Sequence, residues 1–191
     1  MVCDATLGQV FFLQRVGGAQ STSWVLSNTV GTGGGGALVD GAAGVAVFSN
    51  PHGVTELGDA VYVADTGSNA VRRISAAFIV STPVVGLHSP MDVAGCEQDT
   101  CVFIADTMNN KVKKLDLASG FVSDFAGSGD PGVSDGKWDE AAFFRPTGLA
   151  VEGRTVYVVD MLGHTARIIC PVDNQASARR TVLPPLSALV S

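Results

Sequence analysis

The 191-residue chain lacks a basic excess, a long apolar run and a long helical pattern. Its 12 Lys and Arg against 18 Asp and Glu give a net charge of −6. This balance excludes binding to phosphate backbones by bulk attraction, because such binding needs a basic footprint. No window reaches the ~18 apolar residues of a membrane-spanning helix, so no membrane span is expected. The N-terminus carries Asp4 and no basic segment before its apolar run, so no signal peptide is expected.

Turn residues and alternating patterns fill the chain instead. It contains 23 Gly and 8 Pro, and its longest stretches without them mostly alternate apolar and polar side chains. This alternation is the period of a β-strand. A content of 46% hydrophobic and 16% charged residues is enough to bury the core of one domain. The composition therefore predicts an all-β protein of short strands joined by turns.

One phrase occurs three times in the chain. VYVADTGSNAVRRIS at 61–75 returns as VFIADTMNNKVKKLD at 102–116 and as VYVVDMLGHTARIIC at 156–170. A proline and a short strand-like segment precede each phrase, and a more variable strand-like segment follows it. Four short strands in a unit of about 40 residues are the signature of a β-propeller blade. The predicted fold class is therefore all-β, a β-propeller of about four four-stranded blades.

The register of the repeat predicts one domain over residues 1–191, with repeat units near 1–31, 50–87, 88–127 and 145–184. Asp4 fits the position of the repeated aspartate, so the chain is expected to begin in the middle of a unit. Residues 185–191 match the first strand of a blade and form a candidate closing strand. Two alternatives stay open: this strand completes the first blade and closes a ring, or the chain is part of a larger propeller. An array left open exposes unpaired strand edges.

Two longer inserts, 31–50 and 127–145, separate some of the units. They share an aspartate and a phenylalanine at the same distances from the next proline: Asp40 and Phe48 in one, Asp135 and Phe143 in the other. A G-x-G-x-x-G sequence at 31–36 matches a dinucleotide fingerprint. No helical pattern follows it and no βαβ unit contains it, so we expect loop glycines there.

Partner recognition is predicted in the segments that vary between blades, because the blade strands are fixed by packing. These segments are the two inserts and the hairpin 96–101. Trp138 and Phe144 in the second insert are candidate partner-binding anchors, since buried aromatic side chains often carry interface energy. The alternative for both is packing against a neighbouring blade.

These residues resemble the NHL repeat family. The match rests on P-x-G-hydrophobic, then V-Y-V-A-D-T-G-x-N-x-V-R-x-I, then A-G-x-G at the end of a blade. It is strongest over 50–74 and 143–169, good over 89–127, and covers roughly two-thirds of the chain. The resemblance implies a β-propeller. NHL propellers commonly carry six blades, which favours a part of a larger propeller or a reduced one.

The repeated aspartates are the most motif-like acids of the chain. They are Asp65, Asp106 and Asp160. A ring of metal ligands is one interpretation. The other, which we favour, is that each aspartate ends a strand and accepts backbone N–H bonds in the following turn. Residues that tolerate a positive φ stand in that turn: Gly67, Asn69, Asn109 and Asn110.

Basic residues repeat on the predicted third strand of each blade. They are Arg72, Arg73, Lys113, Lys114 and Arg167. The resemblance implies a possible RNA site here, because some NHL proteins bind RNA through a basic face. The acidic net charge and the lack of interleaved aromatic residues favour a solvated blade face instead. Nucleic acid is therefore the less favoured partner, and a protein or peptide is the expected one.

The histidines test an enzymatic interpretation. Peptide-amidating lyases are NHL-like propellers that hold zinc with several histidines near the inner strands. In this chain His52 has Met91 and Thr147 at the equivalent positions of other units, and His88 and His164 lie elsewhere in the repeat. No G-x-S-x-G sequence and no nucleophile with a nearby base is present. We therefore expect a non-catalytic scaffold without cofactor or metal, with a zinc-dependent lyase or hydrolase as the alternative.

Cys96 and Cys101 stand at the facing ends of a predicted hairpin, where a disulfide is geometrically possible. A bridge would favour an oxidising, extracellular setting. The alternative is two free thiols at strand ends. Cys3 and Cys170 fall inside repeat strands and are expected to be small core residues.

Overall fold

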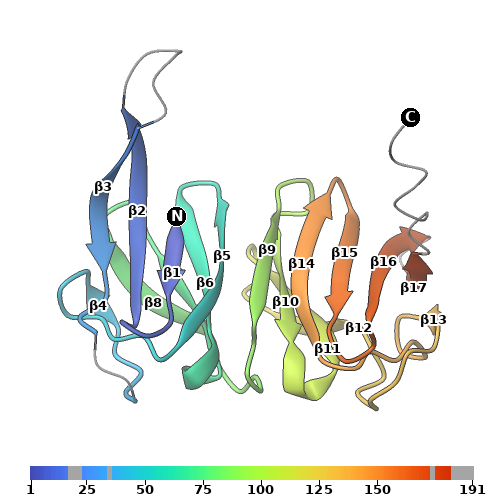
Figure 1. Cartoon of the computed structure of the whole chain (residues 1–191). Coiled ribbons are helices and arrows are strands. Elements are labelled where there is room, and N and C mark those ends of the chain that lie inside the picture. Colours follow the sequence, from blue (N-terminus) through green and yellow to red (C-terminus); the bar gives the residue numbers. More distant parts are fainter. Residues whose placement is uncertain (17–22, 34–35, 173–174, 182–191) are drawn as a thin grey trace.

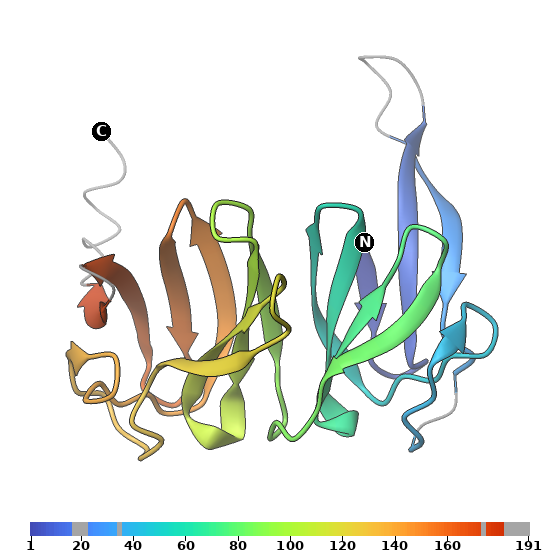
Figure 2. The same cartoon turned by 180° about the vertical axis from the view of Figure 1, so that it is seen from behind.

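The structure is a computed structural model, and it describes residues 1–16, 23–33, 36–172 and 175–181. Antiparallel strands make up nearly all of its regular structure, which confirms the all-β prediction. The strands form four sheets that stand side by side, with sheet 1 and sheet 4 at opposite ends of the row (Figures 1 and 2). Within the described residues, no helix is long and apolar enough to cross a membrane.

Sheets 1 and 2 come first along the chain. Sheet 1 has the order β1-β2-β3, with β1 at Val2–Asp4, β2 at Gln9–Val16 and β3 at Ser23–Val30. Sheet 2 has the order β4-β8-β7-β6-β5. Its strands are β4 (Gly41–Ala42), β5 (Pro51–Leu57), β6 (Ala60–Asp65), β7 (Ala70–Ile74) and β8 (Ile79–Val84). A 3-10 turn, η1 (Thr66–Ser68), joins β6 to β7.

Sheets 3 and 4 repeat this pattern. Sheet 3 has the order β12-β11-β10-β9, from β9 (Asp92–Cys96), β10 (Cys101–Asp106), β11 (Lys111–Asp116) and β12 (Val122–Ala126). The 3-10 turn η2 (Thr107–Asn109) joins β10 to β11. Sheet 4 has the order β13-β17-β16-β15-β14. Its strands are β13 (Gly136–Lys137), β14 (Pro146–Glu152), β15 (Thr155–Asp160), β16 (Thr165–Val172) and β17 (Gln175–Thr181).

The inserts add a feature that the sequence did not indicate. Each contributes a two-residue strand, β4 or β13, to the outer edge of its own sheet. Sheets 2 and 4 therefore have five strands, whereas sheet 3, which has no insert, has four. The candidate closing strand 185–191 lies outside the described residues.

Strand alternation gives every sheet two faces. We name the face that packs on the next sheet along the chain the leading face, and the face that packs on the preceding sheet the trailing face. Between sheets 2 and 3, leading-face Tyr62 and Ala64 meet trailing-face Val102, Ile104 and Leu115. Apolar clusters of the same kind lie between sheets 1 and 2 and between sheets 3 and 4. Burial of these apolar faces holds the row together.

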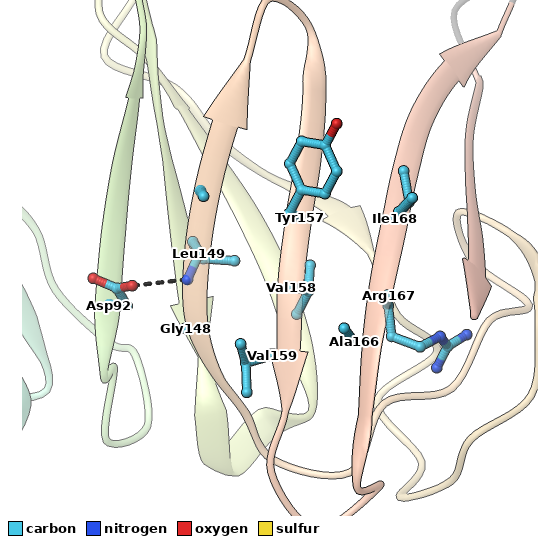
Figure 3. Close-up of a pocket in the computed structure, with 10 residues that line it drawn as sticks. Asp92, Gly148, Leu149, Tyr157, Val158, Val159, Ala166, Arg167 and Ile168 are labelled. Atoms are coloured by element: carbon cyan, nitrogen blue, oxygen red, sulfur yellow. Dashed lines mark hydrogen bonds between the residues drawn. The ribbon is translucent and has the colours of Figure 1, made fainter. Parts of the chain in front are cut away.

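The inner strands β5, β9 and β14 also contact one another directly across the sheets. The N–H of Gly53 on β5 donates to the carbonyl of Met91, at 3.0 Å. On the other side of β9, the Asp92 carboxylate accepts the N–H of Leu149 on β14 at 2.7 Å (Figure 3). These polar links fix the inner edges of neighbouring sheets relative to each other.

Candidate functional site

The repeated aspartates hold the loops that lead into the inner strands. Asp65, Asp106 and Asp160 are buried, and each accepts one backbone N–H at 2.7 Å. The donors are Ser49, His88 and Phe144, each two residues before a proline. The expectation that the backbone donors lie in the following turn is therefore wrong at these three sites. Each aspartate instead ties the end of a strand to a loop of its own unit.

The turns after Asp65 and Asp106 reach the next sheet. Thr107 Oγ1 donates to the carbonyl of Pro146 at 2.7 Å, and Thr66 Oγ1 donates to that of Pro90. Two asparagine side chains, Asn69 and Asn110, accept the backbone N–H groups of Ser89 and Arg145 at 2.8 and 3.0 Å. Both asparagines have a left-handed backbone, as their sequence position predicts. Each turn thus fixes the backbone of the loop beside it.

These bonds create a surface of held backbone and variable side chains, which we name the turn face. It consists of Ser49, Gly67, His88, Met108, Phe144, Met161 and Leu162. The turns lie along the lower edge of the molecule in Figure 1. Residues 50, 89 and 145 beside it all have a left-handed backbone although none is glycine. That conformation is uncommon, and here each of the three residues directly follows one whose N–H bonds to a repeated aspartate.

Apolar side chains are exposed on one part of the turn face. Phe144 is 37% exposed, Met108 is 38% and Met161 is 46% exposed. The backbone brings them together, because the N–H of Leu162 donates to the carbonyl of Phe144 at 3.0 Å and the N–H of Met161 donates to that of Arg145 at 3.1 Å. Arg145 in turn is bonded to the turn that carries Met108. These three exposed apolar side chains therefore lie on neighbouring segments of the turn face.

The two predicted aromatic anchors do not share a site. Phe144 belongs to the turn face and precedes β14, the innermost strand of sheet 4. Trp138 directly follows β13 at the opposite edge of the same sheet, where its carbonyl accepts the N–H of Gly127 at 2.7 Å. Both side chains are partly exposed, and exposed apolar side chains of two other turns, Met108 and Met161, lie near Phe144.

The predicted basic stripe is wrong at Arg72, which is completely buried. Its guanidinium donates to the carbonyls of Val39 and Val47 and to the carboxylates of Asp40 and Asp65, at 2.7–3.0 Å. It also lies over the ring of Phe48, 4.9 Å from the centroid. Arg72 therefore clamps the first insert onto sheet 2 and offers no surface to a nucleic acid.

Arg167 clamps the second insert in the same way. Its guanidinium donates to the carbonyls of Ser134 and Ala142 and to Asp135, and lies 5.0 Å from the centroid of the Phe143 ring. Its contact with Asp160 is longer, at 3.8 Å. Burial raises the pKa of Asp160, and the positive charge of Arg167 opposes that rise. The inserts that the sequence assigned to recognition are therefore structural along their clamped parts.

The other predicted basic residues have acidic partners. Lys113 and Lys111 both pair with Asp124, Lys114 pairs with Asp99, and Arg73 lies 3.9 Å from Asp59. Although burial opposes it, bonds from Lys111 and Lys113 hold the pKa of Asp124 below its usual value. Alternation along β7 also puts Arg72 and Arg73 on opposite faces of sheet 2. These side chains form separate ion pairs in place of one continuous basic surface.

Comparison with known proteins shows which proteins have similar sequence repeats. No family model matches the chain. It is 26% identical to NHL repeat-containing protein 2 of Gallus gallus over 170 residues, which is 68% of this chain and 23% of that protein. It is 37% identical over 84 residues to Protein SUPPRESSOR OF QUENCHING 1, chloroplastic, of Arabidopsis thaliana, which is 44% of this chain and 8% of that protein. The chain is therefore similar to NHL repeat proteins over about two thirds of its length.

Solved structures with the same fold have low sequence identity to this chain. An auxiliary nutrient binding protein of Bacteroides thetaiotaomicron has a TM-score of 0.60 at 14% identity, over 92% of this chain and 44% of that one. Virginiamycin B lyase of Staphylococcus aureus scores 0.52 at 13% identity, over 73% and 46%. A chain of a nidogen/laminin complex scores 0.54 at 15% identity, over 69% and 47%. The β-propeller prediction is confirmed, and the chain spans less than half of these proteins.

The cysteine pair lies where the sequence predicted it, at the facing ends of a hairpin. Cys96 and Cys101 are directly opposite on β9 and β10, and both are buried free thiols in the structure. Cys96 Sγ donates to the carbonyl of Gly153 at 3.4 Å. Burial raises the pKa of Cys101 to about 12, which favours the protonated, less nucleophilic thiol at neutral pH. A bridge between the two stays a prediction.

The histidines lie on three different sheets. His52 Nδ1 is 3.0 Å from the carbonyl of Asn50 and 3.1 Å from Thr66 Oγ1, whereas His88 and His164 are exposed in other loops. Among the described residues, no three His, Cys, Asp or Glu side chains are grouped to hold a metal ion. The aspartates of the repeat face backbone N–H groups and arginines instead.

Proposed function

We propose that the chain is a non-catalytic scaffold that binds a protein or peptide through its turn face. One observation carries this proposal: a repeated set of backbone bonds presents Phe144, Met108 and Met161 as an exposed apolar cluster. A rigid backbone reduces the entropy that an interface loses on binding. The solved nidogen/laminin complex supports it as a case in which a similar propeller is found with a protein partner.

The chemistry of the turn face defines the partner. Phe144, Met108 and Met161 offer an apolar contact, and methionine adapts its shape to different ligands. Arg145, beside Phe144, makes no ion pair in the described part of the chain. The expected ligand is therefore a segment with one or two large apolar side chains and a nearby carboxylate.

A displayed peptide library tests the proposal. The immobilised chain is used to select peptides from the library, and the best one is synthesised. Calorimetry then measures its affinity for the wild type and for the variants Phe144→Ala, Met108→Ala and Phe121→Ala. Phe121 is exposed in the hairpin between β11 and β12, outside the turn face. We expect a loss of about 30-fold for Phe144→Ala, the size of a hot-spot residue, and less than about twofold for Phe121→Ala. Equal losses, or no selected peptide, would contradict the proposal.

The absence of catalysis is part of the same proposal and has its own test. The zinc-dependent alternative needs several histidines to converge, whereas His52 lies on β5 and His88 and His164 lie in two separate loops. Elemental analysis of the chain after incubation with zinc and gel filtration measures the bound metal. Stoichiometric zinc that is lost in His52→Ala and His88→Ala would favour the lyase alternative. We expect less than stoichiometric zinc in all three proteins.

A further inference from the structure

The leading face of sheet 4 differs from the other leading faces because no sheet covers it within the described residues. Tyr157 is 38% exposed and Val159 is 56% exposed. The equivalent residues of sheet 2, Tyr62 and Ala64, are 4% and 0% exposed, because sheet 3 packs on them. An aromatic residue that is buried in sheet 2 is thus left at the surface of sheet 4.

This exposed face is apolar and hollowed. Two cross-strand rows form it, Gly148–Val159–Ala166 and Ala150–Tyr157–Ile168. Tyr157, Val159, Ala166 and Ile168 stand out from β15 and β16 in Figure 3. The hollow over them has a volume of about 380 Å³. Its small residues beside Tyr157 leave room for branched apolar side chains of another sheet.

The trailing face of sheet 1 is exposed at the other end of the row (Figures 1 and 2). Val2 and Leu13 of sheet 1 hold the register positions that Val63 and Ile74 hold in sheet 2. Val63 and Ile74 are buried, because sheet 1 packs on them. Leu26 is paired with Leu13, and alternation puts Trp24 on the same face. All four of these sheet 1 side chains are exposed. Among the residues that the structure describes, the row therefore has an uncovered leading face at one end and an uncovered trailing face at the other.

Leading-to-trailing contact is the way in which all successive sheets pack. It does not require the threonine and asparagine bonds of the repeat. Sheet 1 has Ala5 and Gly8 at those two positions and still packs on sheet 2 through Val10 and Val30. Sheet 4, with Met161 and His164 there, can use the same purely apolar contact.

We propose that two copies of this chain associate head to tail, with the leading face of sheet 4 of each copy on the trailing face of sheet 1 of the other. The contact continues the interface that already joins the sheets within one copy. Two such contacts close the pair and leave no end face exposed.

The mass of the purified 191-residue chain, measured by sedimentation over a concentration range, tests the proposal. We expect a species of twice 19.6 kDa. Val159→Lys on sheet 4 and Leu26→Glu on sheet 1 should each give a monomer, whereas Ile79→Lys, an exposed strand residue of sheet 2, should stay dimeric. A monomeric wild type, a ladder of larger species, or dimers of all three variants would overturn the proposal.

Mixing the variants identifies the two faces. In a mixed pair, Lys on sheet 4 of the Val159→Lys chain faces Glu on sheet 1 of the Leu26→Glu chain. The second contact of that pair joins two wild-type faces, so the mixture should recover the dimer mass. A dimer in which like faces pair would not recover. In a Trp138→Phe background, Trp24 is the one tryptophan left, and its emission should shift to shorter wavelength as the pair forms. An unchanged emission would place the contact elsewhere.

Discussion

Replacing Arg72 by methionine tests whether a buried arginine holds the first insert on sheet 2. The guanidinium makes four hydrogen bonds, two to carboxylates and two to backbone carbonyls, and none of its side chain reaches solvent. Methionine retains part of the packing volume against Phe48 but none of the donors. Asp65 would then be buried without its cation, although the N–H of Ser49 would still bond to it.

The magnitude follows from what is left unpaired. Removing one partner of a buried ion pair costs about 3–5 kcal/mol, because the other charge stays buried. Burial already raises the pKa of Asp65 despite the bonds from Ser68, Ser49 and Arg72, so the unpaired aspartate would take up a proton more readily and limit the cost. We expect Arg72→Met to lower the free energy of unfolding by about 3–4 kcal/mol.

Lys113→Met is the matched control, because Lys113 holds the same register position in sheet 3, where there is no insert. Its pair with Asp124 is partly exposed, so the expected loss is about 1 kcal/mol or less. Asp40→Asn removes the half-exposed partner of Arg72 and should also cost about 1 kcal/mol or less. Urea unfolding followed by circular dichroism measures all three. Equal losses for Arg72→Met and Lys113→Met would refute the clamp.

Three further predictions use contacts between the sheets. Gly53→Ala places a Cβ 2.5 Å from the Asp92 Cα and should cost about 1–3 kcal/mol in thermal unfolding, whereas Gly44→Ala meets nothing within 4 Å and should be neutral. Thr107→Val loses a buried hydrogen bond and should cost about 1–2 kcal/mol; Thr165→Val removes an unpartnered buried hydroxyl and should cost nothing, so equal losses would contradict the assignment. Burial raises the pKa of Asp92 above 3.8 although two N–H groups oppose it. The wild-type protein therefore loses stability as the pH rises through the folded pKa and Asp92 loses its proton, whereas an asparagine does not titrate. In urea unfolding, the free energy of unfolding of Asp92→Asn should rise relative to that of the wild type between about pH 4 and pH 7. A difference between the two proteins that stays constant with pH would contradict this.

The repeat was readable because the second strands of sheets 2 and 3, β6 and β10, are buried on both faces. All six residues of β6 and of β10 are buried, so apolar residues recur there without a polar break, and the aspartate marks the end of each strand. The donors to those aspartates were not readable. They lie 16 to 18 residues away, in loops whose side chains differ from unit to unit, because only their backbone takes part.

Arg72 shows a different failure. The sequence places it beside Arg73, and adjacent charges were interpreted as one basic stripe. The two side chains point to opposite faces of β7, and one of those faces is covered by an insert. A signal for this was present within the chain: the units with arginine at this position are the ones with an insert that carries an aspartate and a phenylalanine. Sheet 3 has Lys113 there and no insert.

The turn face can bind a partner while the leading face of sheet 4 and the trailing face of sheet 1 join two copies. The turn face is formed by strand ends, whereas the other two surfaces are the faces of sheets. A head-to-tail pair is related by a twofold axis through the centre of its ring, so both copies present Phe144 on the same side. A partner with two apolar segments could then bind both copies, and the second contact would form at the effective concentration set by the linker. In that case Val159→Lys, which changes an end face and not the turn face, would weaken the binding of a two-segment peptide. The affinity for a one-segment peptide would stay the same. Equal affinities of the monomeric variant and the wild type for the two-segment peptide would separate the two proposals.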